Sequence, residues 1–235
     1  MDMKDLRLQR AWPTAALLAL GCGHVGMAVP PKVAETSEVL EVTDRSSWTG
    51  GLTDEGFKLA KYSVKEVDRD WQSNSGFSVG PFADKKATTG YQYQLAGGGS
   101  TLKGQCGSET KENSWDLSST SEISWGDTTV ACSCKGGGDA ATLTWSEKSS
   151  EMTVAGTTYE LEAVRQTDTG GQTPDPVGFT ARAGDFLGAV EVTRPGRVWL
   201  NKGLDDRTKA KASCLFVGLM LYQAPAEDTD SDDDD

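Results

Sequence analysis

Short segments in which apolar and polar residues alternate recur through the central part of the chain. Alternation with a period of two places successive side chains on opposite faces of a β-strand. Clear examples lie at 57–64, 90–95, 141–145 and 157–164, and glycine clusters that favour turns separate such segments. The hydrophobic pattern therefore predicts a mainly β fold built from antiparallel strands.

A different pattern near the C-terminus predicts one helix. Asp205 is a suitable N-cap for a helix from about Asp206 to Tyr222. Its second half, 214–222, is apolar on every side and must be buried all round. At 1.5 Å per residue this half is only about 13 Å long, too short to span a membrane. We therefore expect a single antiparallel β-barrel, or a strongly curved sheet, packed around this helix.

The first residues have the pattern of an export signal. Basic residues at 4, 7 and 10 precede an apolar run at 11–20, shorter than the roughly 20 residues that span a bilayer. Gly21 and Cys22 follow, so the segment resembles the lipobox of bacterial lipoproteins, where a signal peptidase cuts before a cysteine that carries a lipid. The resemblance implies a signal peptide over 1–21 and a palmitate-type membrane anchor on Cys22. Ordinary secretory cleavage nearby is the alternative.

The same resemblance implies a compartment. Lipoproteins of this kind reside in the bacterial cell envelope, facing the periplasm or the cell surface. Gly23, which follows the cysteine, is not the aspartate that retains some lipoproteins at the inner membrane. We therefore expect a lipid-anchored protein of the outer membrane.

Composition divides the rest of the chain into three parts. Residues 22–47 contain Pro30 and Pro31 and few bulky groups, which predicts a flexible tether. Residues 48–223 have the size of one all-β domain that includes the C-terminal helix. Residues 224–235 are mostly acidic, which predicts a disordered tail.

The charge balance bears on the partners. The chain carries 23 basic and 35 acidic residues, a net charge of −12. Nucleic-acid binding is driven by the neutralisation of phosphates with Lys and Arg, so we expect no nucleic-acid partner. The expected partners are the membrane, through the N-terminal lipid, and an envelope protein or glycan.

Histidine usage bears on catalysis, because His24 is the chain's one histidine and lies in the predicted tether. A domain without histidine lacks Ser-His-Asp and Cys-His nucleophilic sites and the imidazole ligands of most zinc sites. Carboxylates such as Asp116, Glu122 and Asp127 are abundant, but no motif marks one pair as that of a hydrolase. We expect no metal, no cofactor and no enzymatic activity.

Four cysteines of the predicted domain are candidates for disulfide bonds: Cys106, Cys132, Cys134 and Cys214. Cys132 and Cys134 share one face of a strand, where positions i and i+2 lie roughly 6–7 Å apart, too far for a disulfide. Two arrangements remain open. Either Cys106 pairs with one of them and Cys214 with the other, or a single bond forms and two thiols stay buried.

Residues 177–222 resemble the tubby-like and LURP-one-related barrels, in which strands wrap a hydrophobic C-terminal helix. The resemblance consists of a strand from Gly188, a turn, a strand at 197–200, an acidic helix start and the apolar helix. Members of that group include phosphoinositide and membrane-lipid binders that use basic surface residues. This chain is net acidic, so no lipid-binding residue and no ligand is transferred to it.

Tryptophan is frequent for a chain of this kind, which is typical of modules that stack sugars on exposed indoles. Trp71, Trp115 and Trp125 are the candidates for ligand stacking, because polar residues surround them. Burial in the core is the more ordinary role of tryptophan in alternating strands. We predict a non-catalytic binding or structural protein of the envelope, with a carbohydrate-binding module as the first alternative and a carboxylate-pair hydrolase as the second.

Overall fold

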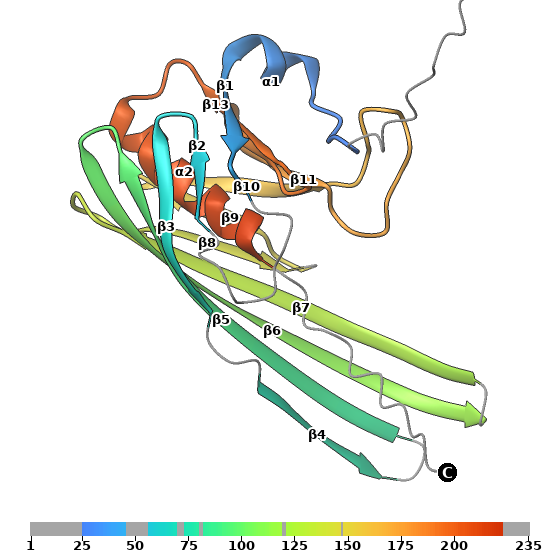
Figure 1. Ribbon diagram of the computed structural model, residues 1–235. Helices are drawn as coiled ribbons and strands as arrows, with labels where there is room; N and C mark the ends of the chain where they lie inside the picture. Colours follow the sequence, from blue (N-terminus) through green and yellow to red (C-terminus); the bar gives the residue numbers. More distant parts are fainter. Residues whose placement is uncertain are drawn as a thin grey trace, which may run out of the picture.

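The computed structural model describes residues 25–45, 56–69, 73–79, 82–118, 121–146 and 148–222, and for 73–79, 82–87, 112–118 and 121–127 it describes the backbone. The predicted barrel around a C-terminal helix is confirmed (Figure 1). Twelve antiparallel strands close into the barrel. They are β1 (Ser37–Thr43), β2 (Phe57–Leu59), β3 (Tyr62–Arg69), β5 (Phe82–Gly97), β6 (Ser100–Ser118), β7 (Ser121–Lys135), β8 (Ala141–Ser146), β9 (Glu151–Val154), β10 (Thr157–Val164), β11 (Gly178–Ala183), β12 (Asp185–Glu191) and β13 (Arg197–Asn201).

The strands follow one another around the barrel in sequence order, and two long-range pairings close the ring. β1 pairs with β13, with Val39 opposite Trp199. β3 pairs with β5, with Val64 opposite Leu95. Strand β4 (Ser73–Val79) pairs with the same edge of β5 as β3 does. It pairs with the N-terminal part of β5, from Phe82 to Thr88, whereas β3 pairs with the part from Tyr91 to Ala96.

Alternating burial fixes the inner face of the barrel. In β6, Leu102 and Cys106 are buried, whereas Thr101 and Lys103, the two neighbours of Leu102, are exposed. Gly97, the last residue of β5 before the turn to β6, has a φ of +151°, and a side chain there would meet the backbone of Lys61 and Tyr62. Glycine at this turn is therefore required by both conformation and space.

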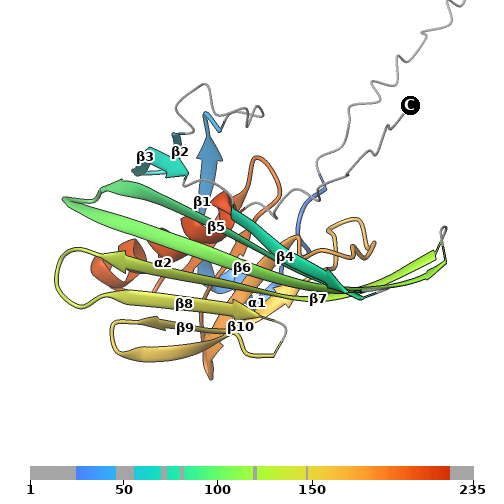
Figure 2. The ribbon, with the colours of Figure 1, turned by 90° about the horizontal axis from the view of Figure 1, so that it is seen from below.

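Helix α2 (Asp206–Leu221) fills the barrel (Figure 2). Its N-cap is Asp205, as predicted, which accepts a hydrogen bond from the Thr208 backbone N–H at 3.0 Å. Strands β6, β7, β8, β9, β12 and β13 contact it from different sides. All residues from Ala210 to Leu221 are buried, including the polar Lys211 and Ser213. The apolar stretch from Cys214 onward is thus enclosed on every side, as its sequence requires.

Two disulfides join these parts. Cys106 in β6 bonds Cys132 in β7, and Cys134 in β7 bonds Cys214 in α2. The arrangement is the first of the two alternatives, and the exclusion of a Cys132–Cys134 bond is confirmed. Strand β7 is thus crosslinked both to the wall of the barrel and to the helix inside it.

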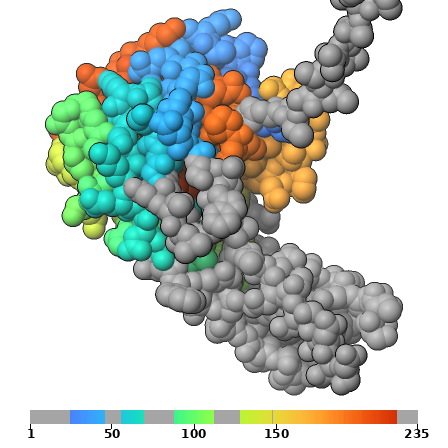
Figure 3. Space-filling model, in the orientation of Figure 1, coloured from blue at the N-terminus to red at the C-terminus, as the bar shows by residue number. Residues whose placement is uncertain are grey.

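The predicted tether over 22–47 is wrong for most of that range, because residues 25–43 belong to the folded domain. After α1 (Pro31–Thr36) the chain enters β1, a wall strand of the barrel. Met27, Val33 and Trp199 are buried together on the outside of the barrel. The few bulky residues of this segment therefore pack against the barrel wall. In the space-filling view the blue surface of the segment adjoins the orange surface of the C-terminal strands (Figure 3).

Strands β5, β6 and β7 continue beyond the barrel wall. β3 covers β5 only from Tyr91 onward, and β8 covers β7 only from Thr129 onward. Past these points β4 and the remaining lengths of β5, β6 and β7 form a four-stranded extension, which we call the projecting sheet (Figures 1 and 2).

Candidate binding surface

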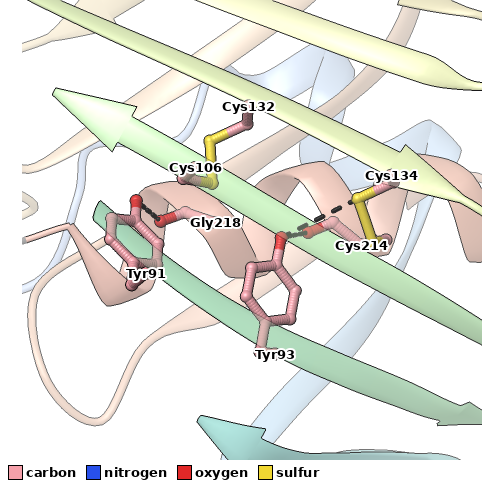
Figure 4. The surroundings of a disulfide bond; sticks show 7 residues. All are labelled: Tyr91, Tyr93, Cys106, Cys132, Cys134, Cys214 and Gly218. Carbon is pink, nitrogen blue, oxygen red and sulfur yellow. Dashed lines mark hydrogen bonds between the residues drawn. A yellow bond between two sulfur atoms is a disulfide. The ribbon is translucent and has the colours of Figure 1, made fainter. Parts of the chain in front are cut away.

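The interior of the barrel is occupied by the protein's own side chains. Tyr91 donates its hydroxyl hydrogen to the Gly218 carbonyl oxygen at 2.7 Å, and Tyr93 donates to the Cys214 carbonyl oxygen at 2.6 Å (Figure 4). A Cβ added to Gly218 would lie 2.7 Å from the Cys106 sulfur, so the helix backbone touches the disulfide. The interior is therefore a packed core around α2 at these positions.

Burial keeps both phenols protonated. Tyr91 and Tyr93 are 2% exposed, and desolvation raises the pKa of each well above its ordinary value. Both are therefore hydrogen-bond donors to the helix over the ordinary pH range. The two tyrosines therefore have a structural role, because each hydroxyl donates its hydrogen bond to a backbone carbonyl of α2.

Two arginines cap the C-terminal end of α2. Arg45 donates to the carbonyl oxygen of Met220, and Arg69 donates to that of Leu221 at 3.0 Å. The last carbonyls of a helix lack intrahelical partners and carry the negative end of its dipole, so cationic donors stabilise this end. Sequence reasoning missed both arginines, because their partners are more than a hundred residues away.

A buried carboxylate lies under the N-terminal segment. Glu191 is fully buried, and its Oε2 accepts hydrogen bonds from the Met27 backbone N–H at 2.9 Å and from Arg197 at 2.7 Å. Hydrogen bonding to Glu191 raises the pKa of Arg197. The pair fastens residues 25–28 to β12 and β13, and the carboxylate is enclosed by the protein.

A shallow cleft of about 440 Å³ lies on the outside of the barrel, lined by residues of β10 and β11 and by Gly184 in the turn after β11. Its one arginine, Arg182, faces Glu160 and Glu162 at 4.0 and 3.6 Å. The cation is therefore already neutralised by exposed carboxylates. This surface offers no unbalanced charge to an anionic ligand.

The outer face of the projecting sheet is fixed by the strands that lead into it. Thr110 and Thr128 face inward and share a hydrogen bond at 3.1 Å, whereas Lys111 is exposed on the outside. Because faces alternate along a strand, the outer series of β6 continues at positions 113 and 115. In β7 the outer series is 129, 127, 125 and 123 by the same count.

Trp115 lies in the apolar row nearest the far end of this outer face. Val79 is opposite Phe82, Phe82 is opposite Trp115, and Trp115 is opposite Ile123. Directly opposed residues share a face, so all four belong to one row across four strands.

Trp125 lies in the next row of the same face. This row runs from Phe77 through Asp84 and Asn113 to Trp125. The structure thus brings together two of the three tryptophans predicted to stack a ligand. Trp71 lies outside the described residues.

The opposite face of the projecting sheet carries small and polar residue types. The row next to that of Trp115 lies on this opposite face. In it, Ser78 is opposite Ala83, Ala83 is opposite Ser114, and Ser114 is opposite Ser124. Farther out on β6 and β7, Asp116 is opposite Glu122, so the strands do pair two carboxylate positions. They share one sheet surface, whereas a hydrolase needs its carboxylates across a substrate cleft.

Within the part of the chain that the structure describes, no group of three or more His, Cys, Asp or Glu residues could hold a metal ion. Over the same residues no helix combines the length and apolar character needed to cross a bilayer. Cys22 lies outside the described residues. Comparison of the chain with protein-family models, with curated proteins and with solved structures found no match.

Proposed function

We propose that this chain is a lipid-anchored protein of the bacterial envelope that acts by binding, through the outside of its barrel, and not by catalysis. The observation that carries the proposal is the filling of the barrel by α2, whose buried residues occupy the place where other small barrels hold a ligand. A partner must then be met on the outer surface. On the projecting sheet, aromatic and aliphatic residues of neighbouring strands are placed directly opposite one another, as Phe82, Trp115 and Ile123 are.

The disulfides support export. Both join residues that are nearly or fully buried, and such crosslinks form and persist in oxidising compartments such as the periplasm. They also support a structural scaffold, because one of them fixes the internal helix to the wall.

The start of the folded domain supports an anchor close to the barrel. Met27 is 1% exposed, and its backbone is hydrogen-bonded to Glu191. The chain from Cys22 to Met27 reaches at most about 18 Å when extended. A lipid on Cys22 would therefore hold the barrel directly against the membrane, without a long spacer.

The deciding measurement is the intact mass of the full chain extracted from membranes, with Cys22→Ser as the matched control. We expect a diacyl or triacyl increment on a product that begins at Cys22, absent in the control. A soluble product cut elsewhere would overturn the anchor. Alkylation of the denatured, unreduced protein should label no thiol at the four disulfide positions.

A carbohydrate-binding module is the second candidate, and one observation favours it. Trp115 and Trp125 occupy neighbouring strands on one face, as a platform for sugar rings requires. Binding of purified peptidoglycan fragments, lost in Trp115→Ser and in Trp125→Ser, would establish this function in place of the first. The hydrolase alternative and the tubby-like resemblance stay predictions.

A further inference from the structure

Four exposed basic side chains lie at the end of the barrel where α2 begins. Three are lysines on the outer face of the wall, Lys65 in β3, Lys103 in β6 and Lys135 in β7. The fourth is Arg207 in the first turn of α2, whose guanidinium lies against Gly138 in the turn between β7 and β8. Gly138 is three residues beyond Lys135, so the arginine continues the line of lysines. We call these four residues the basic strip.

The three lysines share one row across the barrel wall. Lys65 is opposite Gln94, Gln94 is opposite Lys103, and Lys103 is opposite Lys135. Directly opposed residues lie on one face of a sheet, and like charges in such positions destabilise it. The fold therefore keeps Lys103 beside Lys135 at a cost in free energy, which an anion placed over the row would reduce.

The basic strip has no ionic partner in the folded domain. None of its four side chains forms an ion pair within the part of the chain that the structure describes. Two carboxylates lie near it: Glu66 accepts a hydrogen bond from Gln94, and Asp139 follows Gly138 in the turn. Four cations against two carboxylates leave a positive surface on a chain whose net charge is −12.

We infer that the basic strip is the docking surface of the chain's own acidic tail, residues 227–235. Seven of these nine residues are Asp or Glu, and the last four are all aspartates. The inference goes beyond the proposed function and does not depend on a lipid at Cys22. A docked tail covers the strip, so an anionic partner reaches these cations only by displacing the tail.

The length of the tail fits this contact. Tyr222, the last described residue, packs edge-to-face on Trp145 with the ring centroids 6.4 Å apart. Trp145 is opposite Val130, and Lys135 lies five residues farther along β7, about 17 Å at roughly 3.4 Å per residue. The ten residues from Tyr222 to Asp232 span up to about 35 Å when extended. The four final aspartates can therefore pass around the end of β8 and reach the strip on the outer face.

Cations closer to the start of the tail are already engaged. Arg45 and Arg69 donate to the last carbonyls of α2, and Lys111 pairs with Glu109 at 3.1 Å. Carboxylates of the tail would have to compete with these partners, whereas the basic strip offers cations without one.

The tether favours the tail of the same chain over that of a second copy. A segment joined to its site by a short flexible linker has an effective concentration on the order of millimolar, well above that of a dilute second copy. Exposed ion pairs are individually weak and are screened by salt. The contact should therefore form through several charges at once and dissociate at high ionic strength.

The experiment treats the full chain with a carbodiimide, which joins a lysine to a contacting carboxylate without a spacer, and identifies the joined peptides by mass spectrometry. Lys32, exposed on α1 and without an ion pair among the described residues, is the internal reference. The matched variant is Asp232→Asn/Asp233→Asn/Asp234→Asn/Asp235→Asn, in which the rate of lysine acetylation is compared with that of the wild type. Absence of alkylatable thiols at the disulfide positions verifies that both proteins keep the folded barrel.

We expect residues 227–235 to crosslink to Lys103 and Lys135 several times more than to Lys32. These crosslinks should disappear in about 1 M sodium chloride, where the Debye length is about 3 Å. In the variant, Lys103 and Lys135 should be acetylated faster than in the wild type, whereas Lys32 should not change.

Two results would overturn the docking of the tail on its own strip. The first is crosslinking no greater than at Lys32, or equal acetylation in the wild type and the variant. The second is crosslinks found only between isotopically light and heavy copies in a mixed sample, which would assign the strip to the tail of a second copy. Neither result bears on the anchor, which the intact mass tests separately.

Discussion

Tyr93 reaches from the barrel wall to the helix inside it and donates its hydroxyl hydrogen to the backbone carbonyl of Cys214, the residue whose sulfur is bonded to Cys134. The hydroxyl lies 3.8 Å from the Cys134 sulfur as well. Strand β5, strand β7 and α2 therefore meet at one point, through one hydrogen bond and one disulfide. The two buried tyrosines that contact α2, Tyr91 and Tyr93, lead to a prediction for alkaline pH.

We predict that the folded state loses stability above pH 10. Burial raises the pKa of Tyr91 and Tyr93, so in the unfolded chain both ionise from about pH 10 while in the folded chain they stay protonated. Their contribution is fully present below the unfolded pKa and falls by about 1.4 kcal/mol per pH unit for each tyrosine as the pH rises toward the folded pKa. Denaturant unfolding at pH 8 and pH 11 measures this.

Tyr91→Phe/Tyr93→Phe is the matched variant for the alkaline effect. At pH 8 it should lose about 1 kcal/mol for each hydrogen bond. Between pH 8 and pH 11 it should lose less stability than the wild type. Parallel losses in the two proteins would show that other groups cause the alkaline effect.

Gly218→Ala should destabilise the protein by about 1–3 kcal/mol, although alanine is the better helix former. The added Cβ would lie 2.7 Å from the Cys106 sulfur and 2.9 Å from the Cys132 sulfur, closer than carbon and sulfur pack. Replacing both cysteines by alanine should reduce the cost. A double-mutant cycle measured by urea unfolding tests this coupling, and additive effects would contradict it.

The two disulfides should differ in their contribution to stability. Cys134–Cys214 closes 80 residues and Cys106–Cys132 closes 26. Loop-closure entropy then predicts that Cys134→Ala/Cys214→Ala costs about 1 kcal/mol more than Cys106→Ala/Cys132→Ala. Thermal unfolding of both variants provides the comparison, and a larger loss for the Cys106 pair would point to local packing as the dominant effect.

Arg197→Ala should cost about 3–5 kcal/mol, because it leaves the fully buried Glu191 without its cationic partner. Arg182→Ala is the control, since Arg182 pairs with exposed carboxylates on the same sheet and such pairs contribute about 0–1 kcal/mol. The free energies of unfolding in urea give both values. Similar losses would mean that Glu191 is satisfied mainly by Met27 and its other partners.

Much of the barrel could be predicted from local patterns. The segments 141–145 and 157–164 became β8 and β10, and Asp205 caps the helix where its position indicated. The apolar second half of the helix requires an enclosing wall, so the helix itself predicted the curvature of the sheet. These features depend on residues that are close in the sequence, and periodicity reports them directly.

The closure of the ring and the candidate surface depended on distant residues. No local sequence pattern indicates that β1 pairs with β13. Residues 25–43 were therefore interpreted from their composition alone, which is that of a tether. Trp115 and Trp125 share a face with Phe82 only because the β5–β6 and β6–β7 registers align them. A shift of one residue would have separated them, and register is a property of the paired strands.

The disulfide pattern of β7 has a consequence for synthesis and export. Chains leave the ribosome from the N-terminus, and an exported chain would cross the membrane in the same order, so Cys106, Cys132 and Cys134 would emerge well before Cys214. The first two can pair as soon as the β6–β7 hairpin has emerged, and Cys134 then waits for the last helix. A chain interrupted before α2 would keep a free thiol in an unfilled barrel, and an oxidising compartment could recognise that thiol as the mark of an incomplete molecule.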